Sequence, residues 1–186
     1  HLQRGWQSRG HSDTEVVQKH LIADGWRGLA DLNGMFALAH YDRATGTCVL
    51  ARDRAGIKPL YYAELDGSVA FASELATLAT LPGLDKRVDP VALSAYLALG
   101  MVPAPLTILR GVRQLSAGQF ATVTPGRPVS PRPFCARVGA LIGTVPLDRQ
   151  AQDAELERLV LQAVSDQLVA DVPVGVLLSG GVDSSV

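Results

Sequence analysis

A short apolar run that opens into a Gly-Gly turn near the end of the chain restricts the fold most. Residues 174–178 have the length and residue types of a buried strand, and Ser179-Gly180-Gly181-Val182-Asp183-Ser184-Ser185 follows at once. Glycines allow a tight turn whose backbone N–H groups face an anion, and a helix starting after the turn adds further N–H groups. The pattern predicts a phosphate-binding strand–loop–helix unit of an α/β domain.

The side chains of this loop also suit a nucleotide. Ser179, Ser184 and Ser185 carry hydroxyl donors, and the Asp183 carboxylate is suited to Mg²⁺ bridging phosphate oxygens. The loop is not a Walker A motif, because the lysine of the G-K-[ST] ending is missing. A Gly-Gly turn with an Asp or Ser N-cap also occurs in α/β proteins without a nucleotide, so these residues alone leave both interpretations open.

The composition is that of an ordinary globular chain. Of 186 residues, 47% are hydrophobic and 19% are charged, with a net charge of −1, and this length allows a substantial core. The near-neutral charge argues against a nucleic-acid partner, and no apolar stretch reaches the roughly 18 residues of a membrane helix. Cys48 and Cys135 form neither a metal-site spacing nor a disulfide framework, so a cytoplasmic protein with free thiols is expected.

The first 124 residues are expected to form a strand-rich domain. Ser12 and Glu15 fit a capping box for a helix that ends at Gly25 and carries Val16, Val17, His20 and Leu21 on its apolar face. Strands are predicted at residues 35–41, 48–51, 60–64, 69–72 and 119–124. Residues 42–46 are expected to join the first two strands in a hairpin, and the third and fourth are expected to pair around the turn Asp66-Gly67. Helices are predicted at residues 73–81 and after Asp89-Pro90, the second with Val91, Leu93, Tyr96 and Leu97 on its buried side.

The texture changes after residue 124. Five of the chain's eleven prolines lie between residues 125 and 146, so a linker without regular structure is predicted at 125–147. Asp148 is expected to open a long helix with a buried apolar stripe formed by Leu156, Leu159, Val160, Ala163, Val164 and Leu168. Residues 148–186 would then begin an α/β nucleotide domain.

Four motifs in a fixed order carry a family resemblance. They are Ser-Asp-Thr-Glu-Val at 12–16, Leu-Asn-Gly-Met-Phe-Ala at 32–37, Ala-Arg-Asp-Arg-Ala-Gly-Ile-Lys-Pro-Leu-Tyr-Tyr at 51–62, and the strand and loop at 171–185. Phe71-Ala72-Ser73-Glu74 is a fifth, weaker match. With these motifs nearly the whole chain resembles the glutamine-dependent asparagine synthetase family.

The resemblance implies two units. Residues 1–124 would be an incomplete α+β glutaminase domain of the N-terminal nucleophile (Ntn) type, an αββα sandwich, and residues 148–186 the truncated start of an α/β ATP-pyrophosphatase domain, adenine nucleotide α-hydrolase-like. The implied reaction takes ammonia from glutamine, adenylates aspartate with ATP and Mg²⁺, and yields asparagine, AMP and pyrophosphate. Glutamine, ATP and aspartate would be the partners of the parent protein, and a homodimer is left open.

Some site residues transfer from the family one by one. Asp13 matches the acid that pairs with the α-amino group of glutamine, although an acid in a first helical turn also favours the helix dipole. The residues that match the family's ATP loop are Leu177, Ser179, Gly180, Gly181, Asp183 and Ser184, with Asp183 as the metal ligand.

Other motif residues are given structural roles. Asn33 and Gly34 do not match the family's oxyanion-hole Asn-Gly. Arg52, Asp53, Arg54 and Lys58 could form a charged binding cluster, but they are expected instead to fix the turn between strands through hydrogen bonds and ion pairs. Tyr61 and Tyr62 are expected in the core and at a sheet edge.

The catalytic nucleophile of the family has no match here. Such a glutaminase needs cysteine as its first residue, because the residue's own α-amine activates the thiol. His1 occupies that place, and Cys48 and Cys135 lie inside the chain, where the α-amine is part of a peptide bond. The oxyanion-stabilising Asn-Gly-Glu segment expected before Ser12 is absent as well. We therefore expect an internal piece of a larger protein, with no catalytic residue and neither activity on its own.

Two alternatives remain open at this stage. One is a specialised relative with another acceptor, such as a polysaccharide-linked amidotransferase or a β-lactam or peptide cyclase. The presence of Asp13 favours a working glutaminase over a cyclase. The other is a degenerate binding module without catalysis, against which the intact Ser179–Ser185 loop weighs. The acceptor-binding residues are expected beyond Val186.

Overall fold

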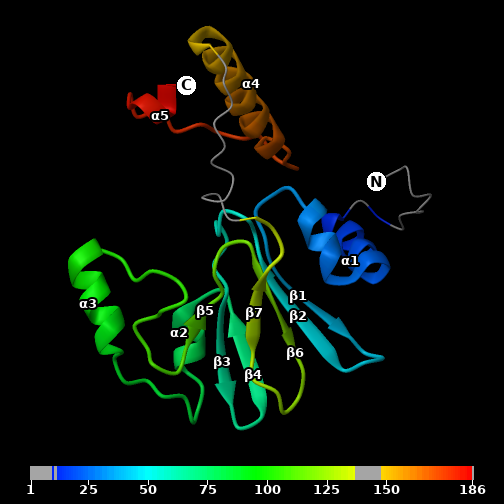
Figure 1. Ribbon diagram of the computed structural model, residues 1–186, viewed down its shortest axis with the longest axis vertical. Coiled ribbons are helices and arrows are strands. Elements are labelled where there is room, and N and C mark those ends of the chain that lie inside the picture. Colours follow the sequence, from blue (N-terminus) through cyan, green and yellow to red (C-terminus); the bar gives the residue numbers. More distant parts are fainter. Residues whose placement is uncertain (1–9, 11, 137–147, 186) are drawn as a thin grey trace. The chain divides into compact units, whose positions relative to one another are not determined.

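The chain divides into two compact units in the computed structural model. The units are His1–Ile142 and Gly143–Val186, and the structure describes residues 10, 12–136 and 148–185 (Figure 1).

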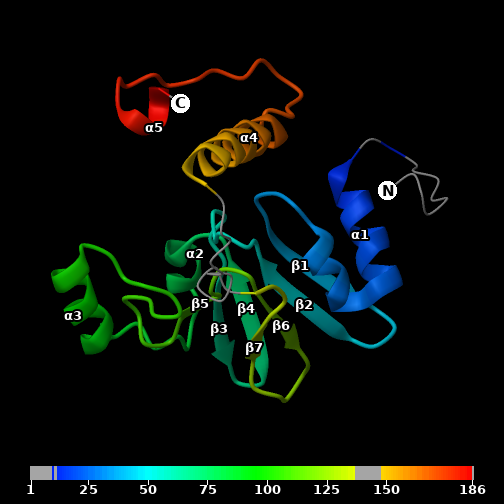
Figure 2. The same cartoon turned by 45° about the horizontal axis from the view of Figure 1, so that its top comes forward.

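Two antiparallel sheets form the centre of the first unit (Figures 1 and 2). The four-stranded sheet has the order β1-β2-β6-β7, with β1 at Ala37–Asp42, β2 at Thr47–Arg52, β6 at Gln119–Val123 and β7 at Ser130–Pro133. The three-stranded sheet has the order β4-β3-β5, with β3 at Tyr61–Leu65, β4 at Ser68–Ala72 and β5 at Arg113–Gln114. Short connections join β1 to β2, β3 to β4 and β6 to β7.

Three apolar clusters fill the spaces between the two sheets and between each sheet and the helices that cover it. In the first cluster, α1 (Asp13–Asp24) and the 3-10 helix η2 (Gly25–Asp31) place Leu21 and Leu29 on the four-stranded sheet. In the second, the two sheets face each other through Leu50, Ala121, Leu60, Tyr62 and Leu115. In the third, α2 (Leu75–Ala79) places Leu78 on the three-stranded sheet. The layer order is therefore helix, sheet, sheet, helix, as expected, because alternate residues of each strand serve different clusters.

Both predicted hairpins are confirmed. β1 pairs with β2 from Ala37↔Arg52 to Asp42↔Thr47, and the Asp42 carboxylate accepts from the Ala44 amide at 2.9 Å within the connection. β3 pairs with β4 around Asp66 and Gly67, whose φ angles are +37° and +81°. Two consecutive positive φ angles are the geometry that Asp-Gly favours in tight hairpins.

The prediction that residues 125–147 contain no regular structure is wrong for part of this range. Ser130–Pro133 forms β7, which pairs with β6 through Thr122↔Ser130 and Phe120↔Arg132. Pro131 and Pro133 are tolerated because β7 is an edge strand, where one side of the strand needs no amide donors. Residues 137–147 lie outside the described residues.

Helix α3 (Pro90–Leu99) begins as predicted but buries a different side. The Asp89 carboxylate accepts from the Val91 amide at 2.8 Å and the Ala92 amide at 3.3 Å. The predicted buried side is wrong, because Ala92 is the buried residue of this helix. The expected core residues Val91, Leu93, Tyr96 and Leu97 are 63%, 41%, 51% and 76% exposed. Apolar residues occur all around α3, so their spacing could not identify the side on which the small Ala92 allows close approach.

The second unit contains one long helix and the Gly-Gly loop. α4 (Arg149–Gln167) is confirmed, and the Asp148 carboxylate caps it by accepting from the Ala151 amide at 2.9 Å. Its predicted buried stripe is wrong, since α4 has no buried residue. The strand predicted at residues 174–178 is also wrong, because no described strand pairs with it, and Leu177 is 94% exposed. Across the described residues, none of the helices combines the length and apolar character needed to cross a bilayer.

The buried carboxylate of Asp53 ties the end of β2 to the loop that follows it. Asp53 is 1% exposed. Its Oδ1 accepts from the amides of Ala55 at 3.1 Å and Ile57 at 3.0 Å, and its Oδ2 from those of Lys58 at 3.0 Å and Phe36 at 3.3 Å. The expected turn-fixing role of Asp53 is confirmed, and backbone N–H groups fulfil it.

The neighbouring Arg52 links the end of β2 to the same loop and to a residue that packs against the second sheet. Its guanidinium donates to the carbonyl groups of Lys58 at 2.8 Å, Gly56 at 2.5 Å and Leu115 at 2.7 Å. A Cβ on Gly56 would lie 3.1 Å from Arg52 Cζ, and Gly56 has a φ of +69°. Glycine is needed here for its conformation and because the guanidinium occupies the adjacent space.

We predict that Asp53→Asn destabilises the first unit by about 3 kcal/mol near pH 7, because an amide presents its NH₂ donors to backbone donors. Burial alone would raise the pKa of Asp53, but the amides of Lys58, Ile57, Phe36 and Gly56 together hold it below its ordinary 3.8. The stabilisation is therefore present above that value and lost as the pH falls through the lower folded pKa. Urea unfolding of both proteins at several pH values measures this.

The matched control is Asp66→Asn, which removes an exposed carboxylate from a turn that asparagine also tolerates. Its effect should stay within about 0.5 kcal/mol at every pH. Equal stability losses in the two variants would show that the Asp53 hydrogen bonds contribute nothing beyond a surface charge.

Candidate functional site

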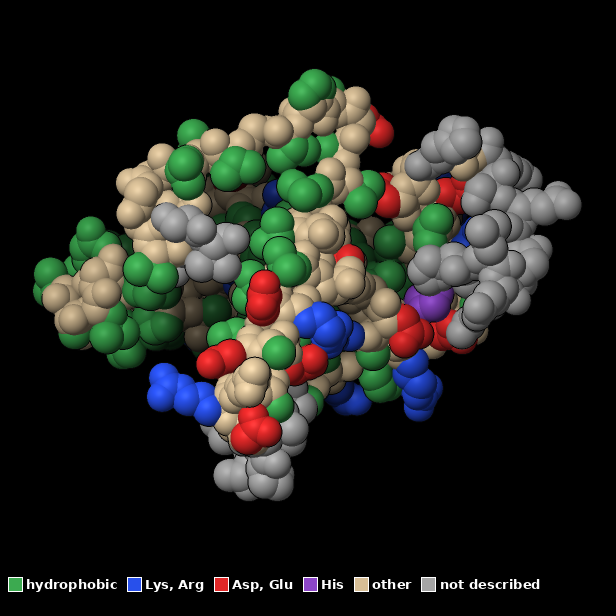
Figure 3. All heavy atoms as spheres, turned by 90° about the horizontal axis from the view of Figure 1, so that it is seen from above, with side chains coloured by type: hydrophobic (Ala, Val, Ile, Leu, Met, Phe, Trp, Pro, Cys, Tyr) green, Lys and Arg blue, Asp and Glu red, His purple; other side chains and the backbone are tan. Residues whose placement is uncertain are grey.

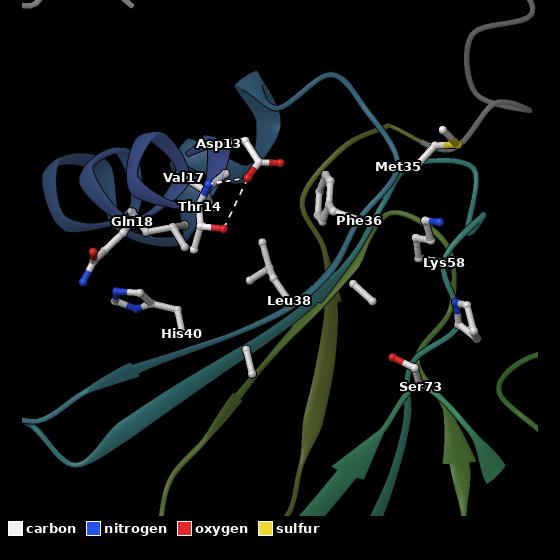
Figure 4. A pocket seen from close by; sticks show the side chains of 14 residues that line it. Asp13, Thr14, Val17, Gln18, Met35, Phe36, Leu38, His40, Lys58 and Ser73 are labelled. Carbon is white, nitrogen blue, oxygen red and sulfur yellow. Dashed lines mark hydrogen bonds between the residues drawn. The ribbon is translucent and has the colours of Figure 1, made fainter. Parts of the chain in front are cut away.

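A pocket of about 450 Å³ lies between the first turns of α1 and the strand β1 (Figure 4). One wall comes from α1 and the other from β1, the residues before it and the loop after Asp53. The lining residues are Asp13, Thr14, Val17, Gln18, Leu21, Met35, Phe36, Ala37, Leu38, Ala39, His40, Lys58, Pro59 and Ser73.

Asp13 is held at the mouth of this pocket by the start of α1. Ser12 is the N-cap, and its Oγ accepts from the Thr14 amide at 3.2 Å. Asp13 Oδ1 accepts from the same amide at 2.6 Å and from Thr14 Oγ1 at 3.3 Å. These bonds orient an exposed carboxylate without burying it. Asp13 therefore favours the helix dipole and is also free in space to meet a cationic group.

Hydrogen bonds to the buried Asp53 carboxylate position the opposite wall of the pocket. Phe36 and Lys58 both line the pocket, and both donate their backbone amides to Asp53. The Phe36 ring also packs on Phe134, with the ring centroids 6.3 Å apart. Figure 4 shows Asp13 and Lys58 on opposite sides, with Phe36 and Leu38 between them. One buried carboxylate thus positions two of the groups that face Asp13.

The lining suits a small polar molecule with an apolar segment. A carboxylate lies on one side, a lysine on the other, and Gln18, His40 and Ser73 add an amide, an imidazole and a hydroxyl. Apolar side chains of α1 and β1 cover the floor between them. None of the described lining residues is a cysteine. The arrangement can therefore hold a zwitterionic amino acid, and it contains no thiol nucleophile.

The loop in the second unit brings together four of the six residues predicted to bind ATP. Gly180 has a φ of +75°. Ser179 Oγ lies 3.0 Å from Ser184 Oγ and accepts from the Gly181 amide at 3.4 Å, and Ser184 Oγ donates to the Gly181 carbonyl at 3.2 Å. The loop thus closes on itself before α5 (Val182–Ser185). The side chain of Asp183 lies outside the described part, so its metal role, like the ATP roles, stays a prediction.

One group of metal-ligating residue types exists among the described residues. His20, Asp24 and Asp31 place one ligand atom each within 4.8 Å of one another. His20 Nε2 lies 3.1 Å from Asp31 Oδ2, a contact that joins α1 to the end of η2. A Cβ on Gly28 would lie 2.7 Å from His20 Cδ2, so the imidazole fills the space between these helices. The packing of the His20 imidazole between α1 and η2 therefore explains why these three residues lie close together.

The sequence predicts a ligand role for Asp13, which stays a prediction, and it favours a turn-fixing role for Lys58 over a place in a charged binding cluster. Ser73 belongs to a family motif but carries no predicted role. His40 and Gln18 carried no signal at all. These residues come from separate segments. The packing of α1 on the four-stranded sheet and the hydrogen bonds of Asp53 to the following loop bring several of them to one pocket.

Comparisons with known proteins match both units. Residues 1–134 match the model of the glutamine amidotransferase domain, and residues 155–186 match that of asparagine synthase. A Mycobacterium tuberculosis protein (strain H37Rv), provisionally named as a glutamine-hydrolyzing asparagine synthetase, is 40% identical over 180 residues, which are 94% of this chain and 26% of that protein.

Two Bacillus subtilis proteins (strain 168) show the same pattern. Glutamine-hydrolyzing asparagine synthetase 1 is 31% identical over 98% of this chain and 28% of its own length, and synthetase 3 is 34% identical over 99% and 30%. The chain thus spans less than a third of these relatives. Because a single family model covers residues 1–134, well over half of the sequence, the chain belongs to the glutamine amidotransferase domain family, with the start of an asparagine synthase segment behind it.

Proposed function

We propose that the pocket at Asp13 binds glutamine and that the chain is the amidotransferase portion of a glutamine-hydrolysing asparagine synthetase. The observation that carries this proposal is the placement of an oriented, exposed Asp13 carboxylate at the mouth of a pocket of about 450 Å³. The names of the relatives support the reaction, and the family match supports the substrate.

Glutamine is complementary to the lining of this pocket. Its α-ammonium group pairs with Asp13 through a charge-assisted hydrogen bond. Its two methylene groups lie on the apolar floor at Phe36 and Leu38, and its carboxamide meets the polar side chains beyond. The bonds from Thr14 that hold Asp13 before a ligand arrives reduce the entropy lost on binding.

We infer that this unit has the fold of an Ntn hydrolase but cannot cleave glutamine by itself. The two-sheet sandwich with outer helices supports the fold assignment. The nucleophile of such a fold is the thiol of a first-residue cysteine, and Cys48 is a strand residue. Burial raises the pKa of the Cys48 thiol, which makes it a poorer nucleophile.

The second unit is proposed to contribute to the ATP site. The left-handed Gly180 and the paired hydroxyls of Ser179 and Ser184 fit a loop that wraps a phosphate, with Gly181 and Leu177 beside it. Asp183 would hold Mg²⁺ there. In the parent protein, ATP would activate aspartate as an adenylate, and ammonia from glutamine would displace AMP, leaving asparagine and pyrophosphate.

We predict that Asp13→Asn weakens glutamine binding to this chain by roughly tenfold or more, since it removes the charge that meets the α-ammonium group. NMR titration with glutamine measures the effect. A ligand without the ammonium group, 4-carbamoylbutanoate, should bind both proteins equally. Asp66→Asn is the control for charge removal elsewhere. If Asp13→Asn weakens both ligands alike, Asp13 does not contact the ammonium group.

We further predict that the purified 186-residue chain releases no ammonia from glutamine above the buffer rate. Coupled detection of ammonia and glutamate measures this, with Cys48→Ser and Cys135→Ser as parallel samples. Hydrolysis that disappears in either variant would show that an internal thiol acts as nucleophile.

A further inference from the structure

A second hollow on the four-stranded sheet has a different chemistry. It has a volume of about 380 Å³ and lies between the start of η2 and the strands β6 and β7. Its lining residues are Trp26, Phe120, Thr122, Thr124, Arg127, Pro128, Ser130 and Arg132. It shares no described lining residue with the pocket at Asp13. We call it the arginine hollow.

The strand register explains why these side chains meet. Phe120 pairs with Arg132 and Thr122 pairs with Ser130 across β6 and β7. Directly paired residues of antiparallel strands point to the same face of the sheet. Arg127 follows β6 in a turn closed by a bond from its amide to the Thr124 carbonyl at 3.1 Å. The two guanidinium groups therefore border one surface from the strand and from the turn.

The charge of this surface is not compensated. Within the part of the chain that the structure describes, no lining residue is acidic, and the guanidinium groups of Arg127 and Arg132 have neither an ion-pair nor a hydrogen-bond partner. Arg52, by contrast, donates to three carbonyl groups. Arg127 and Arg132, whose guanidinium groups have no such partner among the described residues, stand beside three hydroxyl-bearing residues and can offer one anion both charged and neutral donors.

An aromatic wall gives the hollow a fixed side. Trp26 stacks on Phe120 with the ring centroids 4.8 Å apart and the planes 11° apart. Phe120 is buried in the cluster between α1 and the sheet. The Arg27 guanidinium lies 4.9 Å from the Trp26 ring and adds a third positive charge nearby. A wall that excludes water from one side strengthens the attraction of nearby cations for an anion.

We propose that the arginine hollow binds a phosphate-bearing small molecule, with its phosphate between Arg127 and Arg132 and its remaining oxygens on the hydroxyl groups of Thr122 and Ser130. Several donors that line one hollow can meet the three or four acceptor oxygens of a phosphate. The volume exceeds that of one phosphate group, so the ligand is pyrophosphate or a phosphate ester. This inference is independent of the glutamine site.

The test is an NMR titration of the ¹⁵N-labelled chain with pyrophosphate, and in a second arm with glycerol phosphate, at constant ionic strength. The amides of Thr122 and Ser130 should shift and saturate together. Arg132→Gln and Arg127→Gln should each weaken binding by roughly tenfold. Arg132→Lys should fall between, because it keeps the charge but loses the planar fork. A ligand that binds in one arm only identifies its source as the inorganic anion or the ester.

Arg113→Gln is the matched control, since it removes an exposed arginine from the other sheet. It should leave the affinity within about twofold, which distinguishes a site from general attraction by charge. Ser179→Ala alters the Gly-Gly loop and leaves the hollow intact. It should therefore leave the affinity unchanged if the ligand binds in the hollow and not at the loop. The proposal fails if Arg113→Gln weakens binding as much as Arg132→Gln. It also fails if the Thr122 and Ser130 amides of the wild-type chain do not shift with either ligand. Equal melting temperatures of the variants and the wild type show that a change in affinity does not come from unfolding.

Discussion

The buried carboxylate of Asp53 is the interaction on which the first unit depends. It accepts backbone amides from both sides of the β1–β2 hairpin and from the loop that leads to β3. The backbone carbonyl of Asp53 accepts a hydrogen bond from the Gly118 amide at 2.8 Å, just before β6 begins. Arg52 beside it reaches Leu115, which packs between the sheets. These two adjacent residues thus link the end of β2 to the segments that lead into β3 and β6.

These hydrogen bonds of Asp53 also position one wall of the pocket at Asp13. Phe36 and Lys58 receive their positions from Asp53, whereas Asp13 receives its position from the capped start of α1. The two walls are anchored independently, and the α1–η2 pair is joined to the sheet by Leu21, Leu29 and their neighbours. A ligand that contacts both walls finds its contacts already oriented, which lowers the entropy that binding must overcome.

Local chemistry was predictable and distant packing was not. The Asp89 and Asp148 caps and the Asp66-Gly67 turn follow from residues next to one another, and all were expected. The exposed faces of α3 and α4 and the unpaired run at 174–178 depend on what packs against them, which spacing cannot show. β7 was missed because prolines argue against strands except at a sheet edge. The family motifs predict a ligand role for Asp13, whereas only the fold shows that Lys58, His40 and Ser73 line the same pocket.

The most direct test of the account is a crystal structure of this chain grown with glutamine. The account predicts density for the amino acid in the pocket between α1 and β1, with its α-nitrogen within hydrogen-bonding distance of an Asp13 carboxylate oxygen and its methylene groups on Phe36 and Leu38. Glutamine bound elsewhere, or bound in this pocket with its α-nitrogen turned away from Asp13, would contradict it.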